Sequence, residues 1–135
     1  MDTNVFIAAL RSQFGASYRL LMLTGASRFA MVMSVPLILE YEAVAARMLG
    51  ELALDELGLE KLMGYLCGVA EPVKIHFLWR PMLPDPKDDM VLELAVAGRC
   101  DAIVSFNAKD FKPATQFGIH VVTPREFLVA IGELK

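Results

Sequence analysis

Apolar positions along the chain recur with two different spacings, which predict two kinds of element. Runs with apolar residues three or four positions apart, bounded by capping residues, predict helices over residues 4–12, 15–24, 34–48, 55–69, 88–97 and from 124 onward. Short apolar runs with β-type content predict strands over residues 28–34, 72–79, 101–105 and 118–123. This alternation predicts one α/β domain over residues 1–135, with a short parallel sheet covered by helices on both faces.

Polar side chains gather where these strands end. In open parallel sheets, binding sites form at the carboxyl ends of the strands. Asp2 stands where a strand would lead into the first helix, and two acids occupy the helix after the strand at 28–34. Ser105, Asn107 and Asp110 follow the strand at 101–105. We therefore expect these groups to share one pocket with the acids at the start of the helix over 88–97.

The stretch "LPDPKDDMVLELA", residues 83–95, places three aspartates where that helix begins. Asp85 suits the N-cap position and Pro86 the first helical position. Asp88 falls three residues after the cap, where an acid can reach back to it. Asp89 adds a second adjacent negative charge that capping explains less well. Helix capping therefore accounts for Asp85 and leaves a chemical role open for Asp88 or Asp89.

Composition and charge exclude several classes of protein. Hydrophobic residues make up 56% of the chain, yet no apolar run approaches the ~20 residues of a membrane span, and we expect no signal peptide. Cys67 and Cys100 are isolated, which indicates reduced thiols and a cytoplasmic protein. Two histidines are too few for a zinc site. A net charge of −3 argues against a non-specific nucleic-acid binder, although a local basic rim remains compatible with it.

Four motifs occur in an order that resembles a known family. "DTNVFIAAL", an acid in the helix after "MVMS", "DPKDDMVLELA" and "IVSFNAKDF" resemble the PIN-domain family, most closely the PIN-type toxins of bacterial toxin–antitoxin systems. The stretches "LWRPMLPDP" and "VVTPREFL" also fit, so the resemblance covers nearly the whole chain. It implies a three-layer α/β/α sandwich and a ribonuclease that depends on Mg²⁺ or Mn²⁺. It further implies a homodimer and a cognate antitoxin protein.

The resemblance assigns the acids by position. Asp2 matches the first acid of the family and Glu40 the second, with Glu42 as the next-best match. The third acid is Asp89 or Asp88: an ungapped count from "IVSFN" favours Asp89, while the apolar periodicity fits Asp88 equally well. These four positions, Asp2, Glu40, Asp88 and Asp89, are the implied metal ligands.

The remaining polar residues take supporting places. Asn107 falls where the family often has a fourth acid, and Asp110 lies close to it. Ser105 matches a hydroxyl position that would steady the acids by hydrogen bonding. Clustered carboxylates repel one another unless a cation neutralises them, and hard ions such as Mg²⁺ and Mn²⁺ prefer such oxygen ligands. A water polarised by the metal could then attack an RNA phosphodiester.

One departure from the family keeps other functions open. PIN domains carry an apolar strand before the first acid, and here only Met1 precedes Asp2. Either the true start lies upstream, or the strand is truncated and Asp2 is poorly held. In the second case the chain would be a weak or inactive protein-binding module. A phospho-receiver domain is disfavoured, because receivers place paired acids after the first strand.

Overall fold

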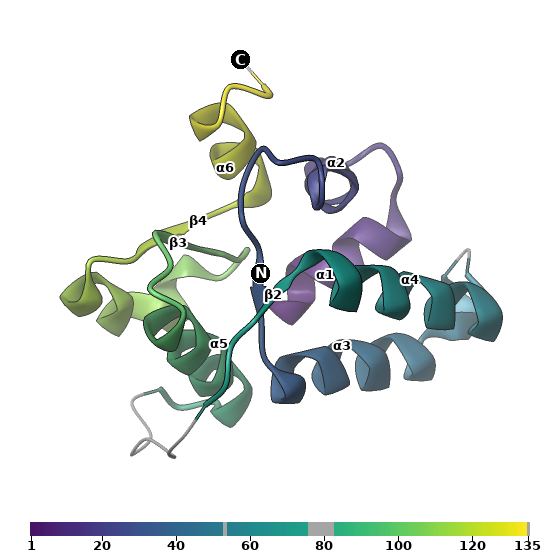
Figure 1. Ribbon diagram of the computed structural model, residues 1–135, viewed down its shortest axis with the longest axis horizontal. Coiled ribbons are helices and arrows are strands. Elements are labelled where there is room, and N and C mark those ends of the chain that lie inside the picture. The colour runs from purple at the N-terminus through teal and green to yellow at the C-terminus, as the bar shows by residue number, and fades with distance from the viewer. Residues whose placement is uncertain (53, 76–82, 135) are drawn as a thin grey trace.

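The computed structural model describes residues 1–52, 54–75 and 83–134, and Figure 1 shows its arrangement of short strands among helices. The helices are α1 (Thr3–Arg11), α2 (Ala16–Leu23), α3 (Val35–Arg47), η1 (Leu49–Glu51), α4 (Glu56–Val69), α5 (Pro86–Ala97), η2 (Ala108–Phe117) and α6 (Pro124–Ala130). The strands are β1 (Val32–Met33), β2 (Glu71–Pro72), β3 (Ala102–Val104) and β4 (His120–Val122). The predicted mixed α/β fold is confirmed.

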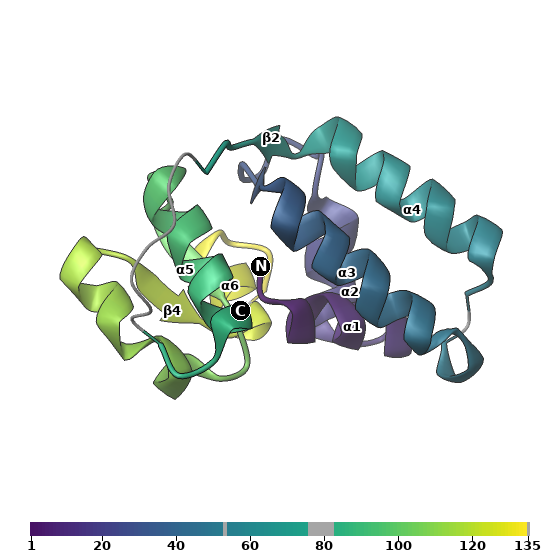
Figure 2. The same ribbon diagram turned by 90° about the horizontal axis from the view of Figure 1, so that it is seen from below.

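The strands form two parallel pairs. β1 pairs with β2, with Val32 opposite Glu71. β3 pairs with β4, with Ala102 opposite His120. Figures 1 and 2 both place the N-terminus near the centre of the molecule, and the Asp2 N–H donates to the Val104 carbonyl at 2.8 Å. The first residues of the chain therefore lie along the edge of β3.

The strand predicted over residues 72–79 is only partly described. Among the described residues, β2 covers Glu71–Pro72, and residues 73–75 have no regular secondary structure. The rest of the predicted strand, residues 76–79, lies outside the described residues. The strand predicted over 28–34 is shorter in the structure and covers Val32–Met33. Short strands depend on a pairing partner, which the apolar pattern does not specify.

Side-chain caps fix where several helices begin. Ser34 accepts a hydrogen bond from the Leu37 N–H at 3.3 Å, and Asp55 accepts one from the Gly58 N–H at 2.7 Å. The predicted cap at Asp85 is confirmed, because its Oδ1 accepts from the Lys87 N–H at 2.9 Å. Each cap satisfies a backbone donor that the first helical turn leaves unpaired.

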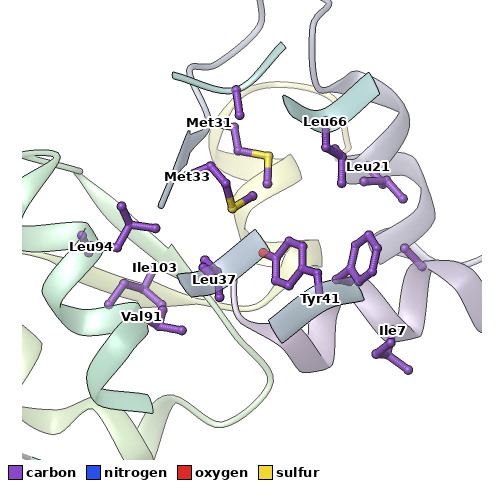
Figure 3. Close-up of a cluster of buried hydrophobic side chains, with 14 of the residues drawn as sticks. Ile7, Leu21, Met31, Met33, Leu37, Tyr41, Leu66, Val91, Leu94 and Ile103 are labelled. Carbon is purple, nitrogen blue, oxygen red and sulfur yellow. The ribbon is translucent and has the colours of Figure 1, made fainter. Parts of the chain in front are cut away.

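A continuous apolar core joins the two halves of the molecule. Figure 3 shows Leu37 and Tyr41 of α3 in the cluster that also contains Val91 of α5 and Ile103 of β3. The rings of Phe6 and Tyr41 stack with their centroids 4.4 Å apart, and both side chains are completely buried. This core holds the ends of β3, α3 and α5 in fixed relative positions, which is what a site between them requires.

The 3-10 helix η2 was not predicted from the sequence. Half of its ten residues are polar, and Pro113 lies inside it. Phe111 and Ala114 are nevertheless fully buried, so two apolar anchors hold a segment of weak helical pattern against the core.

As expected, none of the described helices is long and apolar enough to cross a membrane.

Candidate active site

Asp2 is the centre of the acidic cluster. It is the N-cap residue of α1 and is 7% exposed. Its Oδ2 accepts a hydrogen bond from the Ser105 hydroxyl at 2.7 Å. Burial raises the pKa of this carboxyl and repulsion from Asp110 adds to the effect, while the Ser105 hydroxyl, the N-terminal ammonium and the Thr3 backbone oppose it. Asp2 is thus held in place by specific contacts.

Ser105 connects Asp2 to the segment after β3. It is completely buried, and its backbone N–H donates to the Val122 carbonyl at 2.9 Å. Its hydroxyl donates to Asp2 and accepts from the Asn107 N–H at 3.0 Å. A single side chain therefore fixes both the first acid and the turn that carries Asn107.

Asp88 faces the same cluster from the first turn of α5. Burial raises the pKa of its carboxyl to about 6, and repulsion from Asp2, Asp85, Asp110 and Asp89 adds to the effect. Asp2 and Asp110 belong to other elements, so their influence reflects tertiary packing. Three carboxylates from α1, α5 and η2 thus act on one another electrostatically.

Asp89 is engaged differently from its neighbour. It is 8% exposed, and its Oδ1 accepts a hydrogen bond from the Leu83 N–H at 3.0 Å. This contact ties the segment leading into α5 to the first turn of the helix. The adjacent aspartates, equivalent by sequence pattern, therefore make different contacts in the structure.

Glu40 lies at the margin of the cluster. Its side chain is 17% exposed, and its Oε1 is 3.5 Å from the Lys87 Nζ of α5. Glu42, the next-best match in the sequence, is exposed on α3. The structure therefore brings Glu40, and not Glu42, to the start of α5 where Asp88 lies.

Asn107 and Asp110 lie at the start of η2. Asn107 is exposed, and its carbonyl accepts from the Asp110 N–H at 2.9 Å. Asp110 is half-buried and raises the pKa of both Asp2 and Asp88. Sequence reasoning gave Asp110 only a supporting place. Its electrostatic coupling to two other acids makes it a full member of the cluster.

Two contacts at the site were missed by sequence reasoning. The Tyr41 hydroxyl donates to the Met1 carbonyl, which holds the backbone immediately before Asp2. Lys87 places a cation beside Glu40. In the sequence, Tyr41 looks like an ordinary residue of a helix core, and nothing there indicates that its hydroxyl reaches Met1.

Metal-binding geometry was assessed over residues 1–52, 54–75 and 83–134. Within these ranges, no three His, Cys, Asp or Glu side chains lie close enough together to hold one ion as they stand. The acids of the cluster are brought to one region but are not drawn in around a common point. Mutual repulsion between carboxylates favours such spreading.

Residues 1–109 match the family model of the PIN domain. Searches of the curated proteins and of the solved structures gave no match. The matched range contains the N-terminal acid, the acids of α3 and α5, and the Ser105–Asn107 turn, whereas Asp110 lies one residue beyond it. The chain belongs to the PIN-domain family, a family of predicted metal-dependent nucleases.

Proposed function

We propose that this protein is a metal-dependent endoribonuclease that acts as the toxin of a toxin–antitoxin pair. The observation that carries the proposal is the meeting of Asp2, Asp88 and Asp110 from separate elements: burial raises the pKa of Asp88 to about 6, and repulsion from Asp2 and Asp110 adds to the effect. Acids with pKa values shifted by burial and by neighbouring charges are typical of functional sites. The family match to PIN-domain nucleases supports the same activity.

The donor set of the cluster fits Mg²⁺ or Mn²⁺. All the acids offer hard carboxylate oxygens, the ligand type that these ions prefer. Mg²⁺ is commonly held by one or two carboxylates and several waters, so a preformed cage of three side chains is not needed. Asp2 and Asp88 would hold the ion, and Asp110, Glu40 and Asp89 are the further acids of this region. When bound, the metal supplies positive charge and acidifies a coordinated water.

The protein groups around the acids then have distinct tasks. The Ser105 hydroxyl keeps the Asp2 carboxylate in one orientation. Asp89 fixes the segment that enters α5 through the Leu83 N–H, which sets the position of Asp88 beside it. Asn107 offers an amide where the family often has an acid, so the charge available to bind metal comes from the other residues.

Cleavage of a structured RNA with Mn²⁺ or Mg²⁺, with and without EDTA, tests the activity. We expect cleavage that EDTA abolishes, and a loss of at least a hundredfold for Asp88→Asn, because removing a metal-binding or electrostatic group typically costs this much. Asp101→Asn is the matched control, since Asp101 is an exposed acid at the start of β3. Equal activity of the two variants would contradict the assignment.

The toxin role follows from the family resemblance. An antitoxin could place an arginine against the carboxylates, a pairing with favourable bidentate geometry. Expression of the wild-type chain in bacteria should then arrest growth, and Asp88→Asn should not. A growth arrest of equal strength with Asp88→Asn would show that the effect is independent of the acidic cluster.

A protein-binding module without nuclease activity is the rival function. It is favoured by Asn107 at an acid position and by the absence, within the described ranges, of three acids arranged around one ion. The firm anchoring of Asp2 by Ser105 and Val104 argues for the enzyme. The EDTA-controlled cleavage assay separates the two.

A further inference from the structure

A groove runs along α1 from the acidic cluster. It has a volume of about 650 Å³, within the usual range for ligand sites. Residues of one face of α1 form its floor, and Val44, Met48 and Phe106 form its walls. We call this surface the α1 groove.

The α1 groove lies beside the cluster. Thr3 follows Asp2 in the chain, Phe106 follows Ser105, and both line the groove. Consecutive Cα atoms are about 3.8 Å apart, so one end of the groove is one residue away from the two partners of the Asp2–Ser105 hydrogen bond. The described lining contains none of the acids, so an occupant of the groove would lie beside the cluster.

Two side chains of the groove point to a nucleic-acid strand. Phe106 is a large apolar side chain that is 49% exposed, and exposed aromatic rings are the usual platforms for unpaired bases. Arg11, in the last turn of α1, is the one charged residue among the described residues that line the groove.

We propose that the α1 groove binds the RNA strand beside the cleaved phosphodiester. This inference rests on the proposed nuclease function. An unpaired base stacks on Phe106, and a phosphate further along the strand pairs with Arg11. Arg11 lies about nine residues along the helix from Asp2, roughly 13 Å at 1.5 Å per residue, which is a few nucleotides away. The acids hold the reacting phosphate, and the groove holds the nucleotides that follow it.

A fluorescent RNA tests the stacking contact without requiring cleavage. The probe is a single-stranded oligoribonucleotide with 2-aminopurine, mixed with the protein in EDTA. We expect quenching by the wild type, and for Phe106→Ala about tenfold weaker binding with little quenching, because one stacked base contact is lost. Phe106→Tyr keeps a ring and should keep the quenching. Phe14→Ala is the matched control, since Phe14 is 91% exposed and lies outside the groove.

Arg11 is tested by salt dependence. Each phosphate neutralised on a single strand contributes about −0.7 to the slope of log affinity against log salt. Arg11→Gln should reduce the magnitude of the slope by about this amount, whereas Arg125→Gln, an exposed arginine on α6, should leave it unchanged. Unchanged affinity and slope in both Phe106→Ala and Arg11→Gln would overturn the proposal.

Cleavage measurements separate this inference from the proposed function. Phe106→Ala should lose cleavage of RNA while retaining hydrolysis of bis(4-nitrophenyl) phosphate, which has no base to stack. If wild type and Phe106→Ala cleave both substrates equally well, the groove does not bind RNA as proposed, while the proposed nuclease function stands. If quenching depends on Phe106 but the protein hydrolyses neither substrate, RNA binding in the groove is supported and the proposed nuclease function is rejected. If Phe106→Ala changes self-association and not RNA binding, the groove is a protein interface and the proposal fails.

Discussion

At the scale of single residues, Asp88 sets how stability depends on pH. Its pKa of about 6 lies above the ordinary value of 3.8, so the folded protein binds its proton more tightly than the unfolded chain does. The ionised carboxylate therefore destabilises the fold above pH 6, and this cost disappears as the pH falls through 6 toward 4.

Asp88→Asn should consequently stabilise the metal-free protein at pH 7.5. We expect a gain of about 1 kcal/mol, or roughly 4 °C in Tm for a domain of this size. The gain should shrink as the pH falls below 6 and vanish only well below the ordinary pKa of 3.8, where wild-type Asp88 is protonated in both states. Thermal melts in EDTA at several pH values measure this, and a gain that does not shrink between pH 7.5 and the lowest pH would have another cause.

Asp89 should respond in the opposite direction to its neighbour. Asp89→Ala removes the acceptor of the buried Leu83 N–H and should destabilise the protein by about 2 kcal/mol, the usual cost of losing a hydrogen bond to a charged group. Asp88→Ala serves as the matched variant on the same helical turn. Urea unfolding of both would show the contrast, and equal destabilisation would mean that the two aspartates have similar surroundings.

At the scale of elements, the sequence pattern predicts most of the helices because the signals that start a helix are local. Capping residues such as Ser34 and Asp55 act within one helical turn, so a short stretch of sequence is enough to predict where a helix begins. The helix η2 has no such pattern, because its stability comes from burial of Phe111 and Ala114 against distant residues. The sequence could not predict it.

The same distinction applies to the candidate site. The order of the acids along the chain predicts that they gather near one sheet edge, and this stays a prediction. Telling Asp88 from Asp89 required the hydrogen bond from the Leu83 N–H, and the part played by Asp110 required its electrostatic effect on Asp2 and Asp88, which belong to other elements. Both depend on tertiary packing, which neither periodicity nor spacing encodes.

The N-terminal segment before α1 gives a prediction at the scale of elements. Tyr41→Phe removes the hydroxyl that donates to the Met1 carbonyl, and should cost about 1 kcal/mol and reduce RNA cleavage, because Asp2 follows Met1. Tyr65→Phe removes a comparable hydrogen bond, to the Thr24 carbonyl at 2.7 Å, far from the acids. Melting and cleavage should show loss of activity only for Tyr41→Phe. Equal activity of the two variants would mean that this contact does not position Asp2.

Self-association is the first prediction for the whole molecule. The helical segments over residues 16–24 and 37–49 are rich in Leu, Met, Val and Ala, a composition that predicts an apolar dimer face. Leu39 in the second segment is 57% exposed, and Val35, one turn before it on α3, is 69% exposed. We propose a homodimer at micromolar concentration held by apolar contacts through this face, because exposed apolar patches of this kind mark interaction sites.

Light scattering over a dilution series measures this association. Leu39→Glu should yield a monomer, and Leu57→Glu should remain dimeric, since Leu57 of α4 is equally exposed at 57% but lies outside the predicted segments. Moderate salt should have little effect on an apolar interface. A wild-type monomer at every concentration, or a dimer that salt dissociates, would contradict the proposal.

The central claim is that the acids contributed by α1 and α5 bind a divalent metal. A ligand that binds only the folded state raises its stability in proportion to the logarithm of ligand concentration, so thermal melts in increasing Mn²⁺ test the claim most directly. We predict a progressive rise in Tm for the wild type and for Asp101→Asn, and little or no rise for Asp88→Asn, which begins higher in EDTA. Equal Mn²⁺-dependent shifts in all three proteins, or no shift in the wild type, would contradict the metal site.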